Sequence, residues 1–111
     1  MKIAYLEAGP LLDYWVAKAQ GLQAEIVAPS GPGSEVCVID SGETFSPSTS
    51  WAQAGPIIER EHIDLVSDFG RWMARHGKQQ DYSRADVSPL VTAMRAYLMW
   101  EYGDEVPASA G

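Results

Sequence analysis

The stretch that decides the fold runs from Phe45 to Glu61, with the sequence FSPSTSWAQAGPIIERE. Pro47 fixes its own φ angle and has no N–H to donate, so a strand that reaches it must end there. Short hydroxyl residues follow, and such residues favour turns and helix N-caps. We therefore expect one helical turn to begin at Trp51, capped by Thr49 or Ser50.

A second feature of this stretch is the pair Gly55-Pro56, which interrupts the helical pattern. Proline is tolerated best at the first position of a helix. We predict a second short helix over residues 57–62, with Gly55 absorbing the bend. Trp51 is expected to be a hydrophobic plug, clamped between the sheet and the helices, because a large indole in a loop usually packs inward. The alternative is a ligand-stacking surface at Trp51.

Outward from this stretch, the clearest helices lie near the two ends of the chain. Residues 11–20 place apolar side chains at helical spacing, and Gly21 is a natural left-handed stop. The second helix opens at Ser88-Pro89, a good N-cap followed by a good first residue, and ends at Gly103. This helix is apolar on more than one face, so we expect it to be central or part of an interface.

Short apolar runs between turn residues predict strands. The expected strands are Lys2–Glu7, Gln23–Ala28, Glu35–Asp40, Thr44–Phe45 and Ile63–Val66. Residues 68–76 fit either a helix or a hairpin turning at Asp-Phe-Gly, and we favour the hairpin because Gly70 is costly inside a helix. The resulting fold class is α+β: one small, mostly antiparallel sheet packed against two main helices, with a short Pro-bounded central helix.

The length and charge of the chain limit its possible functions. Its 111 residues predict one compact domain over residues 1–103, followed by a flexible tail of acidic and small residues, 104–111. The 15 acidic and 8 basic residues give a net charge of -7, which disfavours direct nucleic-acid binding and anionic membranes. The only cysteine, Cys37, cannot form an internal disulfide. We expect a cytoplasmic location, since residues typical of a signal peptide or membrane span are lacking.

Three blocks of sequence carry a resemblance to a known family. They are LLDYWVAKAQG (residues 11–21), SPSTSWAQAGPIIERE (46–61) and SPLVTAMRAYLMWEYGDEV (88–106). Together they resemble the NinX-like family of small uncharacterised phage and prophage proteins. This chain has Ala54-Gly55-Pro56 where relatives tend to have Gly-Gly-Pro, which relaxes the turn requirement. The resemblance implies a protein that acts inside a bacterium carrying phage genes, and it implies no activity, cofactor or catalytic residue.

Residues able to carry chemistry are few. Glu59, Glu61 and His62 are close in sequence, but only two of them share a helix face, which favours a solvated helix end over a metal site. A Ser-His-Asp triad could use Ser46 or Ser48 with either histidine, but the chain has no Gly-x-Ser-x-Gly motif to hold the serine. We therefore predict no catalytic residues, no metal and no cofactor.

The leading hypothesis is a non-catalytic accessory protein that binds another protein or itself. Arg95 is expected to pair with Glu59 or Asp13, as a structural contact more often than a functional one. One alternative is an acidic decoy of a nucleic-acid-binding protein, and the other is a small enzyme or ligand-binding protein with a pocket near Trp51. The candidate surface residues are Trp51, Pro56, Glu59, Arg95, Met99 and Trp100.

Overall fold

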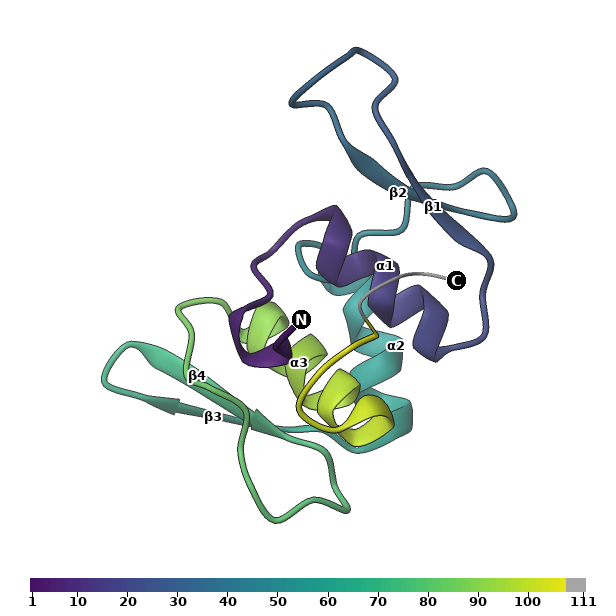
Figure 1. The fold of residues 1–111 in the computed structure, drawn as a ribbon. Helices are drawn as coiled ribbons and strands as arrows, with labels where there is room; N and C mark the ends of the chain where they lie inside the picture. The colour runs from purple at the N-terminus through teal and green to yellow at the C-terminus, as the bar shows by residue number, and fades with distance from the viewer. Residues whose placement is uncertain (108–111) are drawn as a thin grey trace.

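The helix α3 (Pro89–Tyr102) lies at the centre of the fold, and most of the other elements pack around it (Figure 1). The computed structural model describes residues 1–107 of the chain. The other elements in chain order are the 3-10 helix η1 (Ile3–Tyr5), α1 (Pro10–Ala19), β1 (Ala24–Val27), β2 (Val36–Ile39), α2 (Trp51–Glu61), β3 (Asp64–Asp68) and β4 (Arg71–Arg75).

The start and the burial of α3 follow from its sequence. The Ser88 hydroxyl accepts a hydrogen bond from the Val91 N–H, and Pro89 occupies the first turn. Every residue from Leu90 to Leu98 is buried. Because this run exceeds two helical turns, all sides of the helix are covered. The apolar faces of this helix therefore form the core, and α1, α2, η1 and the β3–β4 hairpin pack against them.

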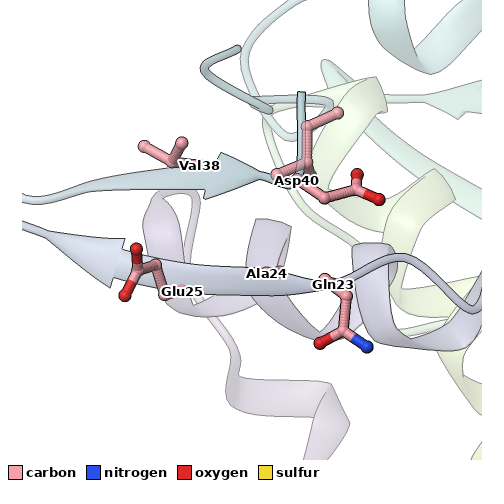
Figure 2. Close-up of a pocket in the computed structure, with 6 residues that line it drawn as sticks. Gln23, Ala24, Glu25, Val38 and Asp40 are labelled. Carbon is pink, nitrogen blue, oxygen red and sulfur yellow. The ribbon is translucent and has the colours of Figure 1, made fainter. Parts of the chain in front are cut away.

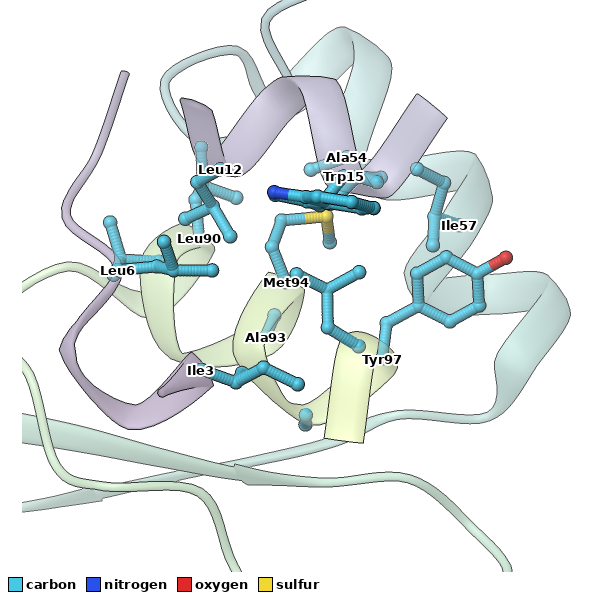
Figure 3. Close-up of a cluster of buried hydrophobic side chains, with 14 of the residues drawn as sticks. Ile3, Leu6, Leu12, Trp15, Ala54, Ile57, Leu90, Ala93, Met94 and Tyr97 are labelled. Atoms are coloured by element: carbon cyan, nitrogen blue, oxygen red, sulfur yellow. The ribbon is translucent and has the colours of Figure 1, made fainter. Parts of the chain in front are cut away.

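The main hydrophobic core lies where α1, α2 and α3 meet. Figure 3 shows Leu12 and Trp15 of α1 facing Leu90 and Met94 of α3, with Ile57 contributed by α2. All five side chains are buried. Burial of each such side chain stabilises the fold by roughly 1.5 to 3 kcal/mol. The prediction of a helix over residues 11–20 is confirmed. The observed helix α1 is shifted by one residue, from Pro10 to Ala19.

The strands form two separate antiparallel hairpins rather than one sheet. In β1–β2, Ala24 pairs with Ile39, and in β3–β4, Asp64 pairs with Arg75. The α+β fold class is confirmed, but the expectation of a single sheet is wrong. The physical reason is that the hairpins cover different helices: β1–β2 packs on α1, and β3–β4 packs on α3. Residues 68–76 form the predicted hairpin.

The middle stretch differs from its prediction in two ways. Residues Trp51–Glu61 form one continuous helix, although Pro56 lies inside it. The proline removes the hydrogen bond to the carbonyl of Ala52 and crowds that carbonyl, and Ala52 lies on the exposed side of the helix. The prediction of a buried indole is also wrong, because Trp51 is 56% exposed. Pro47 and Ser48, in the turn before α2, are fully buried instead.

The two ends of the described chain lie together. Lys2 forms an isolated antiparallel bridge with Glu105, and the Val106 N–H donates to the carbonyl of Met1. Val106 is buried, so packed structure extends past the expected domain boundary at residue 103. The prediction of an edge strand over residues 2–7 is wrong, because the chain turns into η1 after that bridge. The last part of the expected flexible tail, 108–111, lies outside the described residues.

Candidate functional site

The six residues proposed as one partner or ligand surface do not form one surface. They are Trp51, Pro56 and Glu59 on α2, and Arg95, Met99 and Trp100 on α3. The three residues of α2 are exposed, Met99 is half-buried and Arg95 is fully buried. Trp100 is 40% exposed and stacks on His76, the residue that follows β4. The hollows described below lie beside Trp100 and along the β1–β2 hairpin, away from the pocket expected near Trp51.

Arg95 is an interior structural residue. Its Nε atom donates to the carbonyl of Leu6 at 2.9 Å, and its Nη1 atom lies 3.4 Å from Oδ1 of Asp86. The predicted pairing with Glu59 or Asp13 is therefore wrong. A buried guanidinium needs a carboxylate and carbonyl partners close by, and the loop before α3 supplies the carboxylate. Arg95 consequently ties η1 and that loop to the central helix.

Asp13 and Ser48 form a second buried polar contact. Oδ1 of Asp13 accepts from the Ser48 N–H at 2.8 Å, and the Ser48 hydroxyl accepts from the Gly9 N–H at 3.0 Å. Burial raises the pKa of Asp13 to about 6, against the lowering effect of the Ser48 bonds. A triad would need a histidine at this hydroxyl, whereas His76 pairs with Glu61. The Ser48 hydroxyl instead fixes the loop to the start of α1.

Trp100 joins a cluster that connects the ends of α2, β4 and α3. Its indole stacks on the imidazole of His76, with ring centroids 4.4 Å apart and an interplanar angle of 7°. Nε2 of His76 lies 2.9 Å from Oε1 of Glu61, and Nδ1 accepts from the Lys78 N–H at 3.3 Å. A neutral imidazole in this position therefore carries its hydrogen on Nε2 and donates it to the carboxylate.

The electrostatics of the cluster are set by Arg60. Its Nε donates to Oε2 of Glu61 at 2.9 Å, and this bond is the main cause that lowers the pKa of Glu61. The bond from His76 lowers the pKa of Glu61 further, while partial burial opposes both. Glu61 is thus held as a carboxylate with both oxygens bonded. Within residues 1–107, no group of three His, Cys, Asp or Glu side chains is arranged so that it could hold a metal ion.

A hollow of about 360 Å³ opens beside this cluster. Its lining residues are Arg60, Glu61, His62, His76, Gly77, Lys78 and Trp100. Gly77 fits closely against His62: a Cβ on Gly77 would lie 2.9 Å from the carbonyl oxygen of His62. His62 itself has a left-handed backbone, with φ of 53°. The end of α2 and the segment after β4, which form the walls, therefore lie close together. The missing side chain of Gly77, the left-handed backbone of His62 and the Glu61–His76 hydrogen bond make this close approach possible.

The tip of the β3–β4 hairpin is a feature that the sequence analysis did not single out. Phe69 is 99% exposed and has φ of 49°, followed by Gly70 with φ of 79°. Two successive positive φ angles define a two-residue type I′ turn. The signal in the sequence was present, because Asp-Phe-Gly places a bulky apolar residue where such turns favour asparagine. The residue pattern predicts the hairpin, and the structure adds that its aromatic tip is exposed.

Comparison with known protein families identifies the chain. The model of the family described as bacteriophage P22, NinX, matches residues 3–101. The chain belongs to the phage NinX family. The match includes Phe69, His76 and Trp100, so the hairpin tip and the hollow both lie in the NinX region. No curated protein matches the chain. No helix within residues 1–107 of this NinX-family protein is long and apolar enough to cross a membrane.

Proposed function

We propose that this phage-encoded protein is a non-catalytic accessory protein of the bacterial cytoplasm that acts by binding another protein through its β3–β4 hairpin. The observation that carries the proposal is the complete exposure of Phe69 at the hairpin tip. Exposed single apolar residues are common, but a bulky residue with positive φ is not. Figure 1 shows the turn between β3 and β4 extending beyond the helices, so the tip of the hairpin is open to a partner.

The energetics of the tip support a role in binding. A type I′ turn favours Asn-Gly, and placing a phenylalanine in the left-handed region costs roughly 1 to 2 kcal/mol. The exposed ring returns none of that cost within the free protein. Transfer of the ring into an apolar pocket of a partner would contribute roughly 1.5 to 3 kcal/mol. Buried aromatic residues are typical anchors of protein interfaces.

The hairpin is firmly attached along β4, at Trp72 near its turn and at Ala74 near its base. The backbone of Asp86 pairs with that of Trp72 in both directions, at 2.7 and 2.9 Å. Ser83 N–H donates to the carbonyl of Ala74 at 2.6 Å, and the Ser83 hydroxyl lies 2.9 Å from the carbonyl of Thr92 on α3. Because the β3–β4 hairpin is already ordered, binding of a partner to its tip costs little conformational entropy.

The charges along the hairpin, from its base to its tip, indicate which partner chemistry fits. Asp68 lies opposite Arg71 in the strand register, and Asp64 pairs with Arg75 at 2.9 Å. The β3–β4 hairpin therefore presents an apolar side chain at its tip and equal numbers of acidic and basic side chains in these two pairs. An apolar pocket on a partner protein suits this surface better than a phosphate backbone or a strongly charged surface.

The proposal is tested with Phe69→Asn, which suits the turn and removes the ring. The tagged wild type, Phe69→Asn and the control Val87→Asn are used as bait in cells carrying the phage, and direct binding of any captured protein is then measured by calorimetry. Val87 is a suitable control because it is an apolar residue with 71% exposure, outside the hairpin. We expect the wild type and the control to bind one partner that Phe69→Asn loses. Equal binding by all three proteins contradicts the proposal, and a wild-type dimer dissociated by Phe69→Asn identifies a second copy as the partner.

A second candidate function, an acidic decoy of a nucleic-acid-binding protein, is favoured by the distribution of charge. Residues 19–59 contain five acidic residues and no lysine or arginine. Four of them, Glu25, Glu35, Asp40 and Glu43, are exposed on or beside the β1–β2 hairpin. Figure 2 shows the carboxylates of Glu25 and Asp40 at an open hollow of about 240 Å³ on this hairpin.

The decoy function is tested by neutralising these charges. The variant Glu25→Gln/Asp40→Asn/Glu43→Gln should weaken binding to a captured nucleic-acid-binding protein, and binding of the wild type should decrease as salt rises. Competition of that partner with DNA is the measurement. Binding that is insensitive to both the salt concentration and the three substitutions argues against the decoy.

A further inference from the structure

We propose that the hollow between the end of α2 and the end of α3 binds a small planar molecule that carries an anionic group. This site is separate from the hairpin tip and does not depend on the proposed partner. Its volume of about 360 Å³ lies in the range of small-ligand pockets. Its walls combine a half-exposed tryptophan with cationic side chains, which is the combination that recognises an aromatic anion.

The anionic group would be held by Arg60 and Lys78. Both side chains line the hollow, and Lys78 is exposed. The carboxylate of Glu61 is the one acidic group among the lining residues, and both of its oxygens are already bonded, by Arg60 and His76. Because Arg60 balances that carboxylate, Lys78 gives the lining a net positive charge, in a chain whose net charge is -7. An anion would be attracted to this place more than to the rest of the surface.

The end of α2 does not cancel this attraction. The C-terminus of a helix carries partial negative charge on its free carbonyls. Here the N–H groups of His62 and Ile63 donate to the carbonyls of Glu59 and Ile58, at 3.3 and 3.0 Å. The left-handed backbone of His62 makes this closure possible. Fewer free carbonyls therefore remain at this helix end to repel an anion. The positive charge of Arg60, in the last turn, further reduces that repulsion.

The planar part of the ligand would contact Trp100. One face of the indole is stacked on His76, whose ring is fixed by bonds at both nitrogens. The indole is therefore held in one orientation while 40% of Trp100 stays exposed at the hollow. A pre-oriented aromatic surface lowers the cost of ordering on binding.

The test follows the indole N–H signals of the isotope-labelled protein by NMR during titration with phenyl phosphate, benzoate, adenosine 5′-monophosphate and inorganic phosphate. We expect at least one aromatic anion to shift the Trp100 signal saturably, with a dissociation constant in the millimolar range, while the exposed Trp51 stays unchanged. Inorganic phosphate should bind at least several-fold more weakly. Trp51 serves as an internal control because it lies at the opposite end of α2.

Variants then test the named contacts. Lys78→Ala should weaken binding about fivefold, and Arg60→Gln by a similar factor, as expected for loss of one charge-assisted contact. We expect Lys78→Ala to preserve the fold, because Lys78 bonds to His76 through its backbone N–H, which alanine retains. The control Arg71→Ala, on the hairpin, should bind like the wild type. The proposal is overturned if no aromatic anion shifts Trp100 up to about 10 mM, if inorganic phosphate binds equally well, or if both cation variants bind like the wild type.

Discussion

Oε1 of Glu61 lies 2.9 Å from Nε2 of His76, and this contact joins the last residue of α2 to the residue that follows β4. The stacking of His76 on Trp100 extends the connection to α3. Three elements that are distant in sequence therefore meet through one imidazole. His76 is almost fully buried, and the carboxylate of Glu61 gives its Nε2 atom a hydrogen-bond partner there.

Glu61→Gln should lower stability in a pH-dependent way. Arg60 and then His76 lower the pKa of Glu61 from its ordinary value of 4.5, so the folded state favours the carboxylate. The stabilisation is present above pH 4.5 and is lost as the pH falls through the lowered pKa. We expect a loss of about 1 kcal/mol at pH 7, discounted for solvent screening, that shrinks below pH 4.5. Urea unfolding from pH 3 to 7 measures it, with Glu59→Gln as the exposed control on the same helix.

Asp13→Asn should have the opposite pH dependence. Burial raises the pKa of Asp13 from 3.8 to about 6, so the folded state favours the neutral carboxyl. Its contribution is fully present below pH 3.8 and is lost as the pH rises to about 6. Asparagine keeps an oxygen for the Ser48 N–H. The stability of Asp13→Asn relative to the wild type should therefore rise by roughly 2 to 3 kcal/mol from pH 4 to 7. A difference that stays constant over this range would contradict the assignment.

Phe69→Asn should stabilise the free protein while it removes the proposed anchor. Asparagine tolerates the left-handed backbone of the type I′ turn, and Asn-Gly is the favoured pair there. We expect a gain of about 0.5 to 1 kcal/mol in the free energy of unfolding, measured by urea denaturation. Phe69→Ala is the matched control, because it removes the ring without relieving the backbone. A destabilised Phe69→Asn would show that the ring supports the fold.

Asp86→Ala should be strongly destabilising. The substitution leaves the guanidinium of Arg95 buried without its carboxylate, and it also removes the acceptor for the Ser88 N–H. Loss of one partner of a buried ion pair costs about 3 to 5 kcal/mol, and the partial exposure of Asp86 places the expected loss at the lower end. The double variant Asp86→Ala/Arg95→Met should recover part of the loss. Equal stability of the single variant and the wild type would remove Arg95 from its structural role.

Local residue patterns are sufficient to predict α1, α3 and the turn between β3 and β4, but not the continuity of α2 through Pro56 or the formation of η1. The Ser88-Pro89 start, the Gly21 and Gly103 stops and the Asp-Phe-Gly turn each act through the backbone of a few neighbouring residues. For the same reason the α+β class follows from the order of the segments. These signals need no knowledge of distant contacts, and the structure confirms them.

The positions of Trp51, Arg95 and Trp100 depend instead on residues far away in the chain. Trp51 is exposed whereas Pro47 and Ser48 before it are buried, and Arg95 finds its carboxylate in the loop before α3. Trp100 meets an imidazole contributed by the end of β4. Apolar character tells whether a side chain favours burial, but the volume available and the partner at each place arise only when the helices and hairpins pack together.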